Sequence, residues 1–160
     1  MNPELMTEKL QRVLIDALTM CKEANNPELC SEHMIAAFLK DDDIKDLLNS
    51  FHTNVNQLIN ITDNYLNKLP SSDSNSDPSV NRYVAQSFNE ALNKSKQRKD
   101  KYVSLFDMFI TTLFNNSSVS LSPSFLTADN NIPLDSKPLI LRGFKFITAT
   151  TFLPTKSSGL

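Results

Sequence analysis

The sequence predicts an all-α fold in which one helical unit occurs twice. Three observations predict it. Apolar residues recur at spacings of three and four through most of the chain before position 115. Residues that cap helices stand in front of several of these apolar segments. Apolar positions near the start of the chain are also matched, at one constant offset, by apolar positions in its second half, which indicates a duplicated unit.

The first predicted helix runs from about Glu8 to Ala24. Thr7 stands at its N-cap position, where a hydroxyl can accept a hydrogen bond from an unpaired backbone N–H. The sequence Asn25-Asn26-Pro27 ends it. Its apolar residues form one face: Leu10, Val13, Leu14, Ala17, Leu18 and Cys21.

Three shorter helices are predicted next. Ser31 is expected to cap the second, whose sequence EHMIAAFLK is apolar on both faces and therefore mostly buried. The acidic run Asp41 to Asp43 ends that helix and begins a short third one, which presents Ile44, Leu47, Leu48 and Phe51. The fourth helix is predicted from about Val55 to Leu69, where Pro70 ends it. Its predicted stripe is Val55, Leu58, Ile59, Tyr65, Leu66 and Leu69.

The polar stretch from Pro70 to Ser79 is predicted to be a linker, and the helical pattern begins again after it. A stripe of Val80, Val84, Phe88, Ala91 and Leu92 predicts a helix that the basic stretch from 94 to 101 closes. Ser104 and Asp107 resemble a capping box in front of a further apolar segment. Beyond it, four prolines and an alternating pattern from 139 to 153 predict an irregular or partly β tail.

The two halves match position by position at that constant offset. Leu10 matches Val84 and Leu14 matches Phe88, while Met34 matches Met108 and Leu39 matches Leu113. The predicted organisation is a duplicated four-helix repeat with an incomplete second copy. Its divisions are repeat one at 5–69, a linker at 70–79, partial repeat two at 80–118 and a divergent tail at 119–160.

Composition excludes several classes of function. The net charge of -2 and pI near 5.6 favour neither nucleic acid nor an anionic membrane as partner. The chain has two glycines, Gly143 and Gly159, so no P-loop or dinucleotide motif can be written from it. We therefore expect no enzymatic activity and no cofactor. Two cysteines and no signal-peptide pattern favour the cytoplasm.

Cys21, Cys30 and His33 do not match a zinc pattern, and a fourth ligand is missing. No orienting group accompanies a cysteine or serine nucleophile either. Cys21 is interpreted as a core residue, because it lies on the apolar face of its helix. No metal or catalytic residue is predicted.

Two motifs stand out: Met6-Thr7-Glu8-Lys9-Leu10-Gln11 and Ser31-Glu32-His33-Met34, which starts an apolar helix. Both resemble the Clp N-terminal repeat of protein-remodelling chaperones. The ending Asn67-Lys68-Leu69-Pro70 and the segment from Arg98 to Ser104 are similar to the ClpB-like disaggregase branch. The resemblance covers roughly residues 5 to 116.

The resemblance implies a domain that binds unfolded or aggregated proteins, or adaptors, and passes them to a Clp ATPase ring. The resemblance to ClpB-like proteins implies that Thr7 and Asp100 take part in client handling. The resemblance to ClpC-like proteins implies that Glu32 helps to bind a cationic group of the client. The position of Glu32 in the second repeat is Phe106, so a symmetric pair of such pockets is not expected. The candidate client-binding residues, including those of a groove between the repeats, are Thr7, Leu10, Glu32, Val84, Asp100, Tyr102 and Phe106.

Two alternatives stay open. ATPase modules and the last two helices of repeat two are missing from the pattern, which suggests a truncated or frame-altered gene product without function of its own. The basic residues between Lys94 and Lys101 suggest a small helical nucleic-acid binder, although they give only a modest phosphate interaction.

Overall fold

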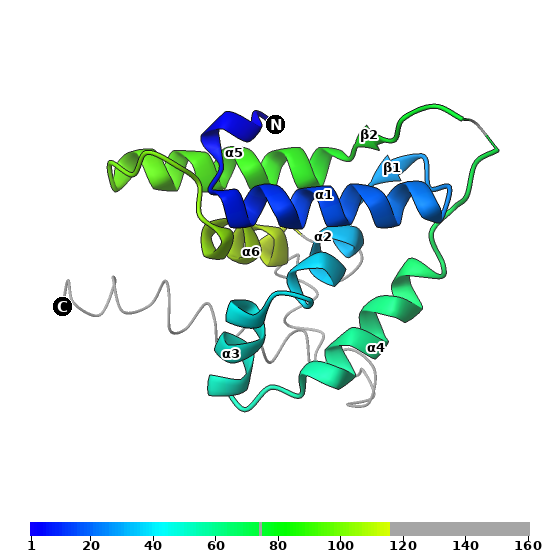
Figure 1. Ribbon diagram of the computed structural model, residues 1–160, viewed down its shortest axis with the longest axis horizontal. Helices are drawn as coiled ribbons and strands as arrows, with labels where there is room; N and C mark the ends of the chain where they lie inside the picture. Colours follow the sequence, from blue (N-terminus) through cyan, green and yellow to red (C-terminus); the bar gives the residue numbers. More distant parts are fainter. Residues whose placement is uncertain (74, 116–160) are drawn as a thin grey trace, which may run out of the picture.

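The computed structural model describes residues 1–73 and 75–115 (Figure 1). The predicted tail at 119–160 and the end of partial repeat two lie outside these residues. Within them the all-α prediction is confirmed: six α-helices accompany one 3-10 turn and two very short strands. In chain order these are η1 (Pro3–Leu5), α1 (Glu8–Glu23), β1 (Glu28–Leu29), α2 (Ser31–Phe38), α3 (Asp42–Ser50), α4 (Val55–Leu66), β2 (Ser79–Val80), α5 (Arg82–Gln97) and α6 (Leu105–Phe114).

Three helices start where the sequence predicts, two of them at the predicted caps. The Thr7 hydroxyl accepts a hydrogen bond from the Leu10 N–H at the start of α1. Asp41 accepts from the backbone at the start of α3, and Ser104 forms the predicted capping box with Asp107 at α6. Because these side chains satisfy N–H groups that have no partner within the helix, they place the first turn of each helix.

The predicted cap of α2 was wrong. Cys30 is the N-cap, and its N–H donates to Nδ1 of His33 at 3.0 Å. Ser31 lies in the first turn, fully buried, and its hydroxyl has no partner among the described residues. The His33 ring thus replaces the acidic side chain that normally closes a capping box.

Two predicted boundaries were also wrong. Val80 does not belong to the helical stripe, because it pairs with Leu29 in β2 and the Asn81 side chain caps α5 after it. α4 ends at Leu66 rather than Leu69, since the next residues turn back with hydrogen bonds from the Lys68 and Leu69 N–H groups to Tyr65 and Leu66. Such tight bonds terminate a helix without proline.

The predicted duplication holds in the positions of the elements. α1 and α5 have the same length, and their first residues, Glu8 and Arg82, are related by the same offset as Leu10 and Val84. Each helix is followed by a residue in the left-handed conformation, Asn25 at φ 53° and Lys99 at φ 62°. The same local turn therefore redirects the chain after each long helix.

The two copies exchange short pairings. Leu29 of the first repeat pairs in parallel with Val80 at the start of the second, and Met6 at the start of the first repeat pairs in parallel with Val103 of the second. The repeat offset relates the two pairings to each other. Each repeat is thus hydrogen-bonded to the start of the other, and these bonds dock the two copies together.

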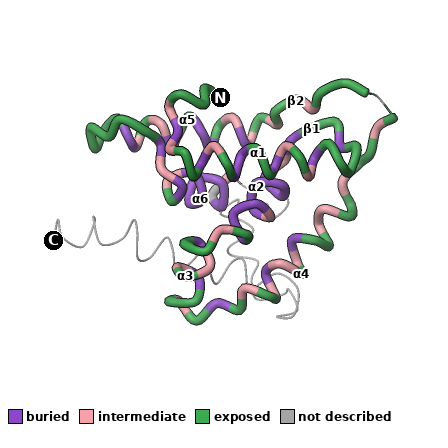
Figure 2. Tube along the Cα trace, viewed as in Figure 1, coloured by how far each residue is buried: buried purple, intermediate pink, exposed green. Residues whose placement is uncertain are grey.

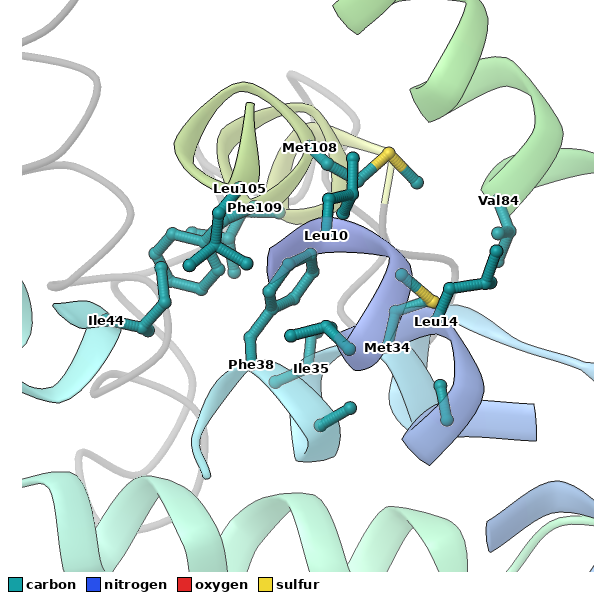
Figure 3. Packing of buried hydrophobic residues seen from close by; sticks show 14 of the residues in the cluster. Leu10, Leu14, Met34, Ile35, Phe38, Ile44, Val84, Leu105, Met108 and Phe109 are labelled. Carbon is teal, nitrogen blue, oxygen red and sulfur yellow. The ribbon is translucent and has the colours of Figure 1, made fainter. Parts of the chain in front are cut away.

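One apolar core joins the repeats. α2 packs on α1, α6 packs on α5, and α2 contacts α6. Figure 2 shows α2 and α6 as the most continuously buried helices, whereas α1, α3 and α4 keep exposed faces. At the contact, the rings of Phe38 and Phe109 meet edge to face, with centroids 5.3 Å apart (Figure 3). No helix in the described part is long and apolar enough to cross a bilayer.

The segment between the repeats is exposed for most of its length but is held at several points. The Ser72 and Ser79 N–H groups donate to the Asn25 and Pro27 carbonyls at 2.7 and 3.0 Å. Asp77 forms an ion pair with Lys22 at 2.7 Å, which lowers the pKa of Asp77. The segment therefore follows the turn after α1.

Lys99→Gly is expected to stabilise the protein by about 0.5–1 kcal/mol, because a side chain with a Cβ is strained in the left-handed region and glycine is not. Urea denaturation with an unchanged m-value would measure it. Asn25→Gly is the matched control at the equivalent turn and should gain less, since asparagine tolerates this conformation. Equal or lower stability of Lys99→Gly would contradict the expectation.

Candidate functional site

The two chain turns related by the repeat present different chemistry. We call residues 94–107 the α5–α6 corner and the equivalent residues 20–33 the α1–α2 corner. The first has Tyr102 and Phe106 where the second has Glu28 and Glu32. An aromatic pair on one corner thus corresponds to a carboxylate pair on the other.

Thr7 lies against the α5–α6 corner. Its N–H donates to the Val103 carbonyl at 3.0 Å, and the Val103 N–H donates to the Leu5 carbonyl at 2.7 Å. Val103 itself is fully buried. The structure therefore brings Thr7 together with the segment that holds Tyr102, although the two lie in different repeats and far apart in the sequence.

Tyr102 and Phe106 are the exposed aromatic residues of the described chain, at 41% and 40% exposure. They flank Val103 and the capped start of α6. The Lys101 ammonium lies 5.2 Å from the centre of the Tyr102 ring, a cation–π arrangement that leaves the charge in water. The corner therefore presents aromatic surface on a hydrogen-bonded backbone.

A polar network forms the other side of this corner. Arg98 binds Asp100 at 2.8 Å and Asp107 at 2.6 Å, and Asp107 also accepts from the Ser104 hydroxyl at 2.9 Å. The hydrogen bond from Arg98 to Asp107 raises the pKa of Arg98. This network fixes Asp100 and the turn after α5, and it holds the Arg98 guanidinium in two ion pairs.

Glu32 is separate from this surface. It is only 5% exposed, and its Oε2 has no hydrogen-bond partner among the described residues. Burial raises the pKa of the Cys30 thiol to about 12, and the Glu32 charge adds to that rise. Burial and the same charge raise the pKa of Tyr65. Glu32 is thus buried in the first turn of α2, close in sequence to Cys30.

The α1–α2 corner borders a pocket of about 340 Å³. It opens between β1, the residues after α4 and β2, with Glu28, Cys30, Leu69 and Ser79 among its lining. Cys21 is buried, and its thiol lies 3.2 Å from the carbonyl of Glu28, a residue of the pocket lining. In the described chain no three potential metal ligands gather.

Leu10 and Val84 belong to the core rather than to a surface. Their exposures are 1% and 0%, and both lie in the cluster that joins the repeats (Figure 3). A ligand cannot contact them while the core is closed. Of the seven candidate residues, the structure brings Thr7, Asp100, Tyr102 and Phe106 to one corner.

Two arrangements were not anticipated from the sequence. One is the Arg98–Asp107 ion pair. The sequence indicated a basic stretch and a capping box, but it did not indicate that a residue of the one binds a residue of the other. The other is the network of His33, whose Nε2 lies 2.9 Å from the Asn26 side chain; Asn26 in turn donates to the Pro70 carbonyl at 2.9 Å. Both depend on turns whose geometry the sequence does not display.

Comparison with known proteins identifies relatives of this fold. A family model described as the Clp repeat N-terminal domain matches residues 5–122. No curated protein matches the chain. The N-terminal domain of Hsp104 from Candida albicans superimposes with a TM-score of 0.64 at 19% identity, covering 88% of this chain and 90% of that one.

Two further solved structures share the fold. The N-terminal domain of the chaperone ClpD from Arabidopsis thaliana gives a TM-score of 0.57 at 11% identity, covering 91% of this chain and 99% of the other. A ClpV N-domain in complex with a VipB peptide gives 0.61 at 17% identity, covering 87% and 88%. At these identities the likeness establishes the shared fold.

Proposed function

The chain belongs to the Clp repeat N-terminal domain family, and from this premise we propose that it is a non-enzymatic module that binds unfolded client proteins or adaptors for a Clp-type remodelling ATPase. The relative solved with a VipB peptide supports peptide binding on this fold. The division at 5–69, 70–79 and 80–118 is part of this proposal, with the two docked repeats acting as one unit. A cytoplasmic location remains a prediction.

The observation that carries the proposal is the exposed aromatic pair at the α5–α6 corner. Most large apolar side chains of the described residues are buried or half-buried, whereas Tyr102 and Phe106 leave about two fifths of their surface in water. Aromatic side chains offer large apolar area at little cost in rotamer entropy, and they anchor many protein interfaces. Tyr102 and Phe106 would therefore be the anchors for a client segment.

The corner is also organised before any ligand arrives. The backbone bonds of Thr7 and Val103 hold one side, and the Arg98–Asp107 ion pair holds the other. A fixed surface loses little conformational entropy on binding. Because only a few hundred Å² can be covered here, we expect an affinity of about micromolar or weaker, which suits transient capture.

Tyr102→Ala combined with Phe106→Ala should weaken binding of an unfolded protein about tenfold, because two partly exposed aromatic anchors are removed. Fluorescence anisotropy with a labelled, chemically unfolded model protein would measure this, alongside light scattering of its aggregation. Circular dichroism should show the variant folded, since neither residue is in the core.

Ile15→Ala is the matched control, because Ile15 is an exposed apolar residue on α1 outside the corner. It should leave the affinity unchanged. If the folded wild-type protein binds no unfolded chain and does not delay aggregation, the proposed function is wrong. If Ile15→Ala and the double variant weaken binding equally, the corner is not the site.

A further inference from the structure

The α5–α6 corner is basic in an acidic protein. Residues 94–107 include five cationic and two acidic side chains, a net charge of +3, whereas the whole chain carries -2. The equivalent α1–α2 corner has one lysine and three glutamates, a net charge of -2 with histidine neutral. The duplicated turn has therefore acquired opposite charge in its two copies.

Three of these cations are directed to solvent. Both acidic groups of the corner bind Arg98. Lys96, Lys99 and Lys101 are exposed, and none forms an ion pair with a carboxylate in the described residues. Lys101 lies over the Tyr102 ring, so at least one free charge sits directly on the aromatic surface. Cationic and aromatic surface thus meet at Lys101 and Tyr102.

We propose that the corner selects acidic peptide segments that carry an aromatic or aliphatic side chain. This inference rests on the proposed function and names the class of client or adaptor segment. The apolar side chain would cover Phe106 and Tyr102, and flanking carboxylates would approach Lys96, Lys99 and Lys101. Complementary charge raises the rate of encounter and rejects segments of the wrong sign.

The charges favour a peptide over nucleic acid. Asp100 and Asp107 stay at the same corner and would repel a phosphate backbone, while Arg98 is held by them. Three free cations release few counterions, which limits phosphate-driven affinity. A peptide can place single carboxylates between these groups, which a continuous row of phosphates cannot do.

The test uses the full chain and three labelled peptides of equal length that share one phenylalanine and differ in the residues flanking it, which are all Glu, all Gln or all Lys. We expect the Glu peptide to bind about tenfold more tightly than the Gln peptide, and the Lys peptide to bind most weakly. The difference between Glu and Gln should close at about 0.5 M salt, where exposed charges are screened.

The matched variants separate charge from packing. Neutralising Lys96, Lys99 and Lys101 to Gln should remove the preference for the Glu peptide and leave the Gln peptide unaffected. Neutralising Lys40, Lys45 and Lys68 to Gln changes the net charge equally outside the corner and should preserve the preference.

Equal binding of the Glu and Gln peptides would overturn this inference and leave the proposed function standing. Failure of all three peptides and of the unfolded protein to bind would defeat both. Single-stranded RNA that binds more tightly than the Glu peptide, with an affinity unchanged by Phe106→Ala, would also overturn the inference and assign the corner to nucleic acid.

Discussion

Phe38→Ala is expected to lower the free energy of unfolding by about 3–5 kcal/mol, the usual range for removing a buried phenylalanine. Phe38 is fully buried at the end of α2 and touches Phe109 of α6 edge to face. Because the two rings belong to different repeats, the cavity would open at the contact between them. Both repeats should therefore lose stability together.

Urea unfolding followed by far-UV circular dichroism would measure the change, and a cycle with Phe109→Ala would isolate the ring pair. We expect a coupling of about 0.5–1.5 kcal/mol between the two substitutions. Phe106→Ala is the matched control on the same helix, and it should cost under about 1 kcal/mol because the ring is partly exposed. Separate unfolding transitions for the two repeats in the Phe38 variant would contradict the shared core.

Acidification from pH 7 to pH 5 is expected to destabilise the protein through His33. The ring is buried, and its Nδ1 accepts the Cys30 N–H, so the neutral ring carries its proton on Nε2 and donates to Asn26. A second proton, on Nδ1, would leave the Cys30 N–H without its acceptor and would place a positive charge on a buried ring. Burial accordingly lowers the pKa of His33 from 6.5.

The direction of the pH effect follows from this lowered pKa. Below pH 6.5 the unfolded chain binds a proton that the folded ring resists, so stability falls as pH falls toward the folded pKa. The free energy of unfolding can change by up to about 1.4 kcal/mol per pH unit. The stabilisation that the neutral His33 ring contributes is fully present above about pH 6.5. Most carboxylates titrate at lower pH, so the window from 7 to 5 reports chiefly on histidine.

His33→Gln should remove this pH dependence and cost about 1–3 kcal/mol at pH 7, since Cys30 and Asn26 lose a buried partner. His52→Gln provides the control, because His52 is exposed in a turn after α3. Urea midpoints at several pH values would distinguish the two. A wild-type slope that survives in His33→Gln would show that another group is responsible.

Helix positions were largely predictable because their determinants are local. Helix starts were indicated by the hydroxyl or carboxylate groups of Thr7, Asp41 and Ser104. The end of α1 lies next to the predicted boundary at Ala24. Val80 was misassigned because its apolar side chain fits a helical stripe, whereas its backbone pairs with Leu29 in the first repeat. Periodicity does not report such a long-range bond.

The candidate site was predictable in part for the same reason. Residue type and resemblance led to Thr7, Asp100, Tyr102 and Phe106, which lie together. Leu10 and Val84 also have apolar side chains on a helix, and nothing in that pattern distinguishes a core position from a groove. Their burial is decided by the helices packed over them.

By itself, the sequence determined that a helical unit occurs twice, because apolar spacing and capping groups act within a few residues and recur at a constant offset along the chain. Only the tertiary structure decided that each copy pairs with the start of the other. That exchange brings Met6 to Val103 and so places Thr7 beside Tyr102. Backbone hydrogen bonds between distant segments depend on how the helices dock, and docking is a property of the assembled core.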